Sequence, residues 1–155
     1  MIDRPDITEK LSKLVAKRLD SQNSYWAPEV NFDENTKNAR RVDFVGFKPY
    51  SFNGVLEPTC VELGTFTCYE VKSCMGDFKS GHGLSFYGDE NYLVTTQEFA
   101  EELRNKMMLP RGVNAILCPD KNWTRLYTKF DLRKPEIHRT RAASEMLWAI
   151  AQLHR

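Results

Sequence analysis

Residues 66–73, FTCYEVKS, decide how the middle of this chain folds. Apolar side chains alternate with polar ones across much of this stretch, which is typical of a β-strand. Successive side chains of a strand point to opposite faces, so Tyr69 and Val71 share one face, and Glu70 and Lys72 share the other. A carboxylate and an ammonium on one face of a central strand are either a bracing ion pair or part of a metal-dependent active site.

Helices and strands are predicted on both sides of this strand. Asp6 and Glu9 form a D-x-x-E capping box ahead of an apolar helical face, so a helix should begin there. Thr96 is expected to be the N-cap of a second helix. The predicted elements, in chain order, are a helix to about residue 20, strands at 24–32, 39–49 and 66–73, a loop or short helix at 75–83, a strand at 91–96, a helix at 96–107, strands at 112–119 and 123–130, and a helix at 139–155.

This order predicts an α/β fold, with one mixed sheet flanked by helices, in a single domain over residues 1–155. The strands at 24–32 and 39–49 should form an antiparallel hairpin beside the 66–73 strand. The strand at 112–119 should run parallel to the 66–73 strand, because the helix at 96–107 carries the chain back.

The amino-acid composition limits the functions that this chain can have. The 155 residues are 41% hydrophobic and carry a net charge of +1, so any nucleic-acid partner must be bound by a local patch. No apolar run approaches the roughly 20 residues that span a bilayer, and the N-terminus is too charged for a signal peptide. The four cysteines show no CxxC spacing, which argues against a zinc site and predicts reduced thiols in a cytoplasmic protein.

Asp43 interrupts an otherwise apolar strand. An unpaired buried carboxylate is costly, so something should compensate its charge. One interpretation is an ion pair with Arg40, Arg41 or Lys72. The other is a metal site, because hard cations such as Mg²⁺ take one or two protein carboxylates together with water and substrate phosphate.

Asp43 and Glu70 would supply these two carboxylates if their strands are neighbours. The backbone carbonyl of Val71 is a candidate third ligand. Lys72 would then orient or deprotonate a water, or stabilise charge on a phosphate. Metal-assisted hydrolysis of a phosphodiester needs these parts.

The pattern Asp43, Glu70, Lys72 resembles the D…(D/E)xK signature of the PD-(D/E)xK, or restriction-endonuclease-like, nuclease superfamily. The stretch YEVKSCMGDF is most similar to small MmcB-like and phage-encoded members, and the resemblance covers roughly residues 7–118. Three features depart from the usual pattern. Val42 replaces the proline that often precedes the Asp, Ser73 follows the lysine where a glutamine is common, and the segment between about residues 49 and 64 is long.

The resemblance implies a restriction-endonuclease-like core and a Mg²⁺-dependent deoxyribonuclease, with Mn²⁺ able to substitute. It implies DNA as the partner, in repair, recombination or phage DNA processing, and many relatives act as homodimers. Some relatives place a carboxylate of the first helix in the site, which makes Glu9 a candidate third carboxylate. The alternative is a non-catalytic DNA-binding or inhibitor protein on the same fold. A third interpretation is a structural domain in which Glu70 pairs with Lys72 and Asp43 with an arginine.

Several further residues admit two interpretations. Arg41 should lie on the Asp43 face and is a candidate for binding DNA phosphate, as is Lys79. Asp77 and Lys79 either line the cleft of the predicted metal site or belong to a solvated loop. His82 is either a proton shuttle or a turn residue. Tyr87 and Tyr92 either stack on unpaired bases or pack in the core or at its rim, and packing is the simpler prediction. Trp26, Trp123 and Trp148 are predicted to lie in the core.

Overall fold

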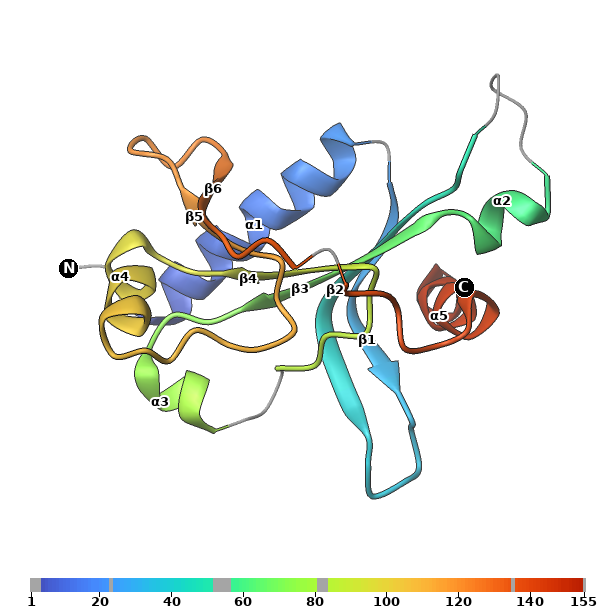
Figure 1. Cartoon of the computed structure of the whole chain (residues 1–155), viewed down its shortest axis with the longest axis horizontal. Coiled ribbons are helices and arrows are strands. Elements are labelled where there is room, and N and C mark those ends of the chain that lie inside the picture. Colours follow the sequence, from blue (N-terminus) through green and yellow to red (C-terminus); the bar gives the residue numbers. More distant parts are fainter. Residues whose placement is uncertain (1–3, 23, 52–56, 81–83, 135, 155) are drawn as a thin grey trace.

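The computed structural model describes residues 4–22, 24–51, 57–80, 84–134 and 136–154. It contains a six-stranded mixed sheet flanked by helices (Figure 1). The elements in chain order are α1 (Arg4–Ser21), β1 (Tyr25–Phe32), β2 (Arg40–Lys48), α2 (Thr59–Glu62), β3 (Thr65–Val71), α3 (Met75–Lys79), β4 (Glu90–Val94), α4 (Gln97–Asn105), β5 (Ala115–Pro119), β6 (Leu126–Asp131), α5 (Ala143–Ala151) and a final 3₁₀ turn (Gln152–His154).

The strands lie in the sheet in the same order as in the chain, β1-β2-β3-β4-β5-β6. Strands β1, β2 and β3 form an antiparallel meander, β3, β4 and β5 are parallel, and β6 returns antiparallel. The predicted hairpin and its position beside β3 are therefore confirmed. Strand β5 runs parallel to β3, as predicted, with β4 inserted between them.

Helices cover both faces of the sheet. Leu11, Val15 and Leu19 of α1 pack with Tyr69 and Val71 on one face. On the other face, α5 covers β1 and β2, while α3 and α4 cover β4 and β5. Figure 1 shows α5 well separated from α3 and α4 along this second face. Glu70 of the central strand is paired with Leu93 of β4, which packs in the core beneath α3 and α4.

The regular alternation of strand side chains slips by one residue beside Asp43. Val42 and Val45 are three residues apart in β2, yet both pack in the core beneath α5. On the facing strand, Ala27 and Val30 show the same three-residue spacing, and Glu29 between them has a φ of 52°. A non-glycine residue rarely adopts this left-handed conformation, and such outliers concentrate at functional sites.

Two helix boundaries differ from the sequence predictions. In the described residues helix α1 begins at Arg4, so Asp6 lies in its first turn and does not act as the N-cap of a capping box. Helix α5 begins at Ala143, not at Arg139. The reason is that the side chains of Arg139 and Arg141 and the N–H of Thr140, which donates to the Tyr87 carbonyl, attach this segment to other parts of the fold. The predicted cap of α4 is confirmed, because the Thr96 hydroxyl accepts a hydrogen bond from Phe99 N–H at 3.2 Å.

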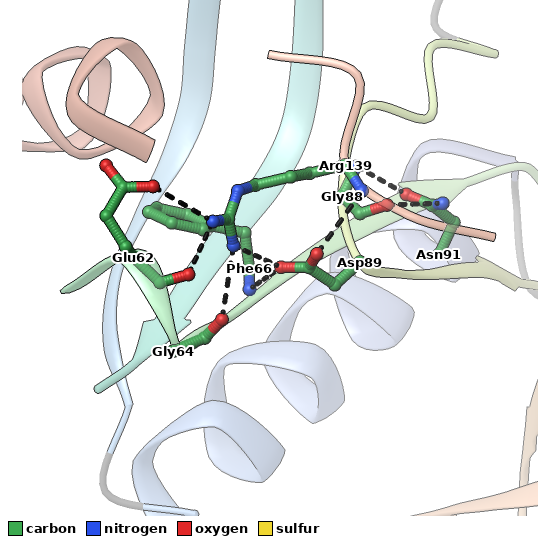
Figure 2. Close-up of polar contacts among 7 residues, drawn as sticks. All are labelled: Glu62, Gly64, Phe66, Gly88, Asp89, Asn91 and Arg139. Atoms are coloured by element: carbon green, nitrogen blue, oxygen red, sulfur yellow. Dashed lines mark hydrogen bonds and ion pairs between the residues drawn. The ribbon is translucent and has the colours of Figure 1, made fainter. Parts of the chain in front are cut away.

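Arg139 fastens the segment before α5 to two loops (Figure 2). Its guanidinium donates to the carbonyl oxygens of Glu62 and Gly64 and to the Asp89 carboxylate. Asp89 also accepts the backbone N–H of Phe66 at 2.9 Å and of Arg139 at 3.2 Å. Arg139 and Asp89 thereby join α2, the start of β3, the turn before β4 and the segment before α5.

Most of the aromatic side chains pack as predicted, with one exception. Trp26, Trp123 and Tyr92 lie against the core beneath α1, and Tyr87 against the core beneath α5. Trp148 is 66% exposed, so its prediction as a core residue is wrong. It lies on the outer side of α5, between the buried Met146 and Ile150.

The described part of the chain has no helix that is both long and apolar enough to cross a membrane.

Candidate active site

The Asp43 and Glu70 side chains meet where strands β2 and β3 separate. The last ladder pair between these strands is Phe44 with Tyr69. Beyond it, side chains replace the backbone ladder: Asp43 Oδ2 accepts the Val71 N–H at 2.8 Å, and Glu70 Oε1 lies 3.4 Å from the Asp43 backbone nitrogen that donates to it. Each carboxyl group thus hydrogen-bonds the opposite strand, and the two carboxyl groups hydrogen-bond each other. The predicted approach of Asp43 to Glu70 is therefore observed.

Burial and mutual repulsion keep a proton on this pair. Glu70 is 0% exposed. Loss of hydration raises its pKa to about 10, and the charge of Asp43 and the hydrogen bond between the carboxyl groups act in the same direction. Burial also raises the pKa of Asp43, although the Val71 N–H and the charges of Lys72 and Arg41 partly oppose this. At neutral pH Glu70 therefore carries a proton and no charge.

Lys72 is buried beside the pair, at the end of β3. Its side chain is only 5% exposed, and Nζ lies 3.4 Å from Asp77 Oδ1 of α3. The positive charge of Lys72 lowers the pKa of both Asp43 and Glu70. The structural interpretation that paired Glu70 with Lys72 and Asp43 with an arginine does not describe this arrangement, because Lys72 forms an ion pair with Asp77, and Asp43 is hydrogen-bonded to Val71 and Glu70.

A cleft of about 460 Å³ opens beside the carboxyl pair. Asp43, Lys72 and Asp77 line its interior side, and Arg40 and Arg41 contribute from β2. The cleft extends to α1, where the Thr8 hydroxyl donates to Ser73 Oγ at 3.2 Å. An acidic interior with arginines nearby suits a ligand that combines a cation with phosphate groups.

The residues of this site fit a hard divalent cation. Glu70 Oε2 is buried and has no hydrogen-bond partner, which is a costly state for a carboxyl oxygen. Two carboxyl groups are as many as Mg²⁺ usually takes from a protein, with water and substrate completing its shell. Among the described residues there is no cluster of three or more acidic, histidine or cysteine side chains suited to a metal. Asp43, Glu70 and the Val71 carbonyl are thus the protein ligands that the sequence predicts.

The other candidate residues lie at different distances from the cleft. Arg41 lines it with a side chain that is 59% exposed, and its nearest carboxylate, on Glu29, is 4.0 Å away. Lys79 is exposed at the end of α3 and is not among the residues that line the cleft. Glu9 is not among them either, because its carboxylate lies 3.3 Å from Lys13 one turn along α1. His82 lies outside the described residues.

The sequence leaves Asp77 either in the cleft or in a solvated loop, and the structure places it in the cleft, where it forms an ion pair with Lys72. Thr8 and Ser73 are not predicted from the sequence as residues of the site. The signal for Asp77 is its spacing: a residue five positions after Lys72, in the first turn of a short helix, comes back over the end of the strand. The contact between Thr8 and Ser73 joins residues 65 positions apart, and no local pattern indicates it.

Comparison with known proteins adds no relative to this description of the site. A scan against protein-family models, a search of curated proteins and a search of solved structures each found no match to the chain.

Proposed function

We propose that this protein is a metal-dependent nuclease that hydrolyses phosphodiester bonds of DNA, with a restriction-endonuclease-like arrangement of its core. The observation that carries the proposal is the buried Asp43–Glu70 pair. Glu70 is buried, protonated at neutral pH and has one unpartnered oxygen, and its neighbours Asp43 and Lys72 line a cleft flanked by arginines. A carboxyl pair kept this close and this dry is destabilised without a compensating cation.

Each residue of the site would have a separate role in the hydrolysis. Asp43, Glu70 and the Val71 carbonyl would hold Mg²⁺, or Mn²⁺ in its place. When bound, such a cation polarises a phosphoryl oxygen and lowers the pKa of a coordinated water. Lys72 would place positive charge beside the phosphate as negative charge develops on it, and Asp77 would keep the ammonium group in position. Arg41 would contact a DNA phosphate from the cleft wall.

The setting of this activity is also a proposal. Cys60, Cys68, Cys74 and Cys118 are all free thiols, which favours a reducing compartment such as the cytoplasm. DNA repair, recombination or phage DNA processing are the roles in which a small nuclease of this kind would act. A homodimer would allow it to cut both strands of a duplex.

A cleavage assay with matched variants tests the proposal. Single-stranded, duplex and branched DNA would each be incubated with the protein in Mg²⁺, Mn²⁺ or EDTA, and Mn²⁺ binding would be measured by calorimetry. We expect cleavage with either metal and none in EDTA. Asp43→Asn and Glu70→Gln should lose both cleavage and Mn²⁺ binding. Lys72→Met should retain Mn²⁺ binding and lose cleavage by about 100-fold or more, as for other lost transition-state charges.

Exposed residues away from the cleft supply the controls. Glu136→Gln and Lys121→Met remove the same charges and should behave as wild type. DNA binding without cleavage in any metal would instead identify a non-catalytic DNA-binding protein. Absence of both Mn²⁺ binding and cleavage would leave the carboxyl pair a structural feature.

A further inference from the structure

The β1–β2 hairpin extends beyond the rest of the molecule, next to the cleft. Figure 1 shows its turn and the adjoining ends of β1 and β2 extending beyond the helices, while Val30, Phe32 and Val42 of the same strands pack in the core beneath α5. The second strand starts with Arg40 and Arg41, which line the cleft, and Lys37 lies exposed in the turn. The hairpin thus carries three cations, Lys37, Arg40 and Arg41, together with the carboxylates of Glu29, Asp33 and Glu34, and it leads directly to the Asp43–Glu70 pair.

The two arginines are weakly engaged by the protein. Arg40 donates only to the carbonyl of the adjacent Ala39 among its described contacts, at 3.2 Å. Arg41 is 4.0 Å from Glu29, with both side chains mostly exposed. Exposed ion pairs of this length contribute little, so both guanidinium groups are available to an incoming phosphate.

Val30, Phe32 and Val42 of the hairpin pack in the core beneath α5. Beyond the β2–β3 ladder the hairpin has only two strands, which alone are marginally stable, so its outer end is also stabilised by an anchor. Arg141 supplies one from the segment before α5. Its guanidinium donates two hydrogen bonds to the Asp33 carboxylate, at 2.8 and 2.6 Å, at the point where β1 enters the turn. It lies over the ring of Tyr87 at 4.5 Å and near that of Phe32 at 5.8 Å.

This anchor has a second effect on the hairpin. Asp33 adopts a φ of 55°, an uncommon conformation that the two hydrogen bonds from Arg141 help to stabilise. The hydrogen bonds to Arg141 lower the pKa of Asp33, so its carboxylate stays ionised and paired. Because Arg141 neutralises Asp33, the acidic side chains that remain beside Lys37, Arg40 and Arg41 are Glu34 and Glu29, the latter 4.0 Å from Arg41.

We propose that the β1–β2 hairpin is a phosphate-binding arm for DNA, that Arg40 and Arg41 contact successive phosphates, and that Arg141 is the positioning residue that holds the arm over the cleft through Asp33. This inference rests on the proposed function for the identity of the partner. It adds Arg40 and Arg141 to the residues that engage DNA and assigns the C-terminal segment a part in substrate binding.

DNA binding in EDTA tests the arm separately from catalysis. Fluorescence anisotropy of a labelled duplex would be followed over a range of NaCl concentrations. Arg40→Gln combined with Arg41→Gln should weaken binding about tenfold or more. It should also reduce the slope of log K against log salt by about 2, since each lost phosphate contact removes about 0.9. Arg104→Gln with Lys106→Gln on α4 removes the same number of cations from another surface and should leave the slope unchanged.

A double-mutant cycle tests the positioning role. Arg141→Met and Asp33→Asn should each weaken DNA binding about fivefold, and the double variant should be no weaker than either single one, because both changes break the same contact. Arg104→Met removes an arginine stacked on Phe130 at 5.0 Å and serves as the matched control. With Mg²⁺ present, the single variants should raise KM while kcat at saturating DNA stays unchanged. If Arg141→Met does not fold, Asp33→Asn still tests the contact from the hairpin side.

The outcomes separate the two proposals. An unchanged salt slope in the Arg40–Arg41 variant, or a lowered melting temperature in Asp33→Asn with unchanged DNA affinity, would overturn the arm. Failure of the wild type to cleave in Mg²⁺ or Mn²⁺, with the binding differences intact, would overturn the nuclease and leave the arm standing.

Discussion

At the scale of single residues, the unusual feature is a glutamic acid that is fully buried and carries a partly unsatisfied carboxyl group. Most buried carboxyl groups are paired with a cation or fully hydrogen-bonded. Glu70 has one oxygen near the Asp43 backbone and one without a partner. Such a group lowers the stability of the fold unless its proton or a bound cation compensates its charge, so its presence favours a functional role.

The protonation of Glu70 makes stability depend on pH. Because its pKa is raised to about 10 in the folded chain, its stabilising contribution is complete below the unfolded value near 4.5 and is lost as pH rises toward 10. We therefore expect the free energy of unfolding in EDTA to fall between pH 5 and pH 8. Glu70→Gln should flatten this dependence, and at pH 8 it should be more stable than wild type by more than about 1.4 kcal/mol, the equivalent of one pKa unit.

Urea unfolding at several pH values, with wild type and Glu70→Gln side by side, measures this difference. Comparison of the two proteins cancels the titration of groups that they share. Glu136→Gln is the control for removing an exposed carboxylate. Parallel pH profiles for wild type and Glu70→Gln would show that Glu70 is ionised in the folded chain at neutral pH.

At the scale of elements, two arginines each join segments that are not paired by backbone hydrogen bonds of the sheet. Arg139 binds α2 and the turn before β4, and Arg141 binds the β1–β2 hairpin. Both lie in the irregular stretch between β6 and α5, so this stretch is held by charged hydrogen bonds more than by apolar packing. The planar guanidinium, with five donors, suits such multiple contacts better than a lysine would.

Removal of the Arg139 side chain should destabilise the fold substantially. Arg139→Met would leave the part-buried Asp89 carboxylate without its cation and would remove donors from the carbonyls of Glu62 and Gly64. We expect a loss of about 2 kcal/mol in the free energy of unfolding, in the range of hydrogen bonds to charged groups. Urea denaturation measures it, and Lys121→Met is the exposed control. A loss below about 0.5 kcal/mol would mean that solvent replaces these contacts without cost.

At the scale of the whole molecule, cation binding at the Asp43–Glu70 pair should stabilise the complete fold. The pair joins β2 to β3 at the centre of the sheet, and the unfolded chain cannot bring these carboxyl groups together. Mass action predicts a gain of about 2.7 kcal/mol at a Mn²⁺ concentration of 100 times Kd. Thermal melting with and without Mn²⁺ measures the shift, which Asp43→Asn should abolish and Lys72→Met should retain. An equal shift in wild type and Asp43→Asn would place the cation elsewhere.

Local sequence patterns predict most of the helices and strands and the two residues of the carboxyl pair. Strand alternation, helix periodicity and the Thr96 cap are local patterns, and they predicted the hairpin, its neighbour β3 and helix α4 because local sequence dictates these features. Asp43 stood out as a charge in an apolar strand. Its approach to Glu70 followed once β2 and β3 were predicted as neighbours.

Contacts between distant segments follow from the folded arrangement of the chain and not from local patterns. Arg141 meets Asp33 across 108 positions, and Arg139 meets Glu62 across 77. Local patterns cannot specify such pairs, because many arginines and carboxylates in the chain are equivalent until the sheet brings two of them together. The exposure of Trp148 has the same origin, because helix periodicity alone gives the spacing of apolar residues without the width of the buried face.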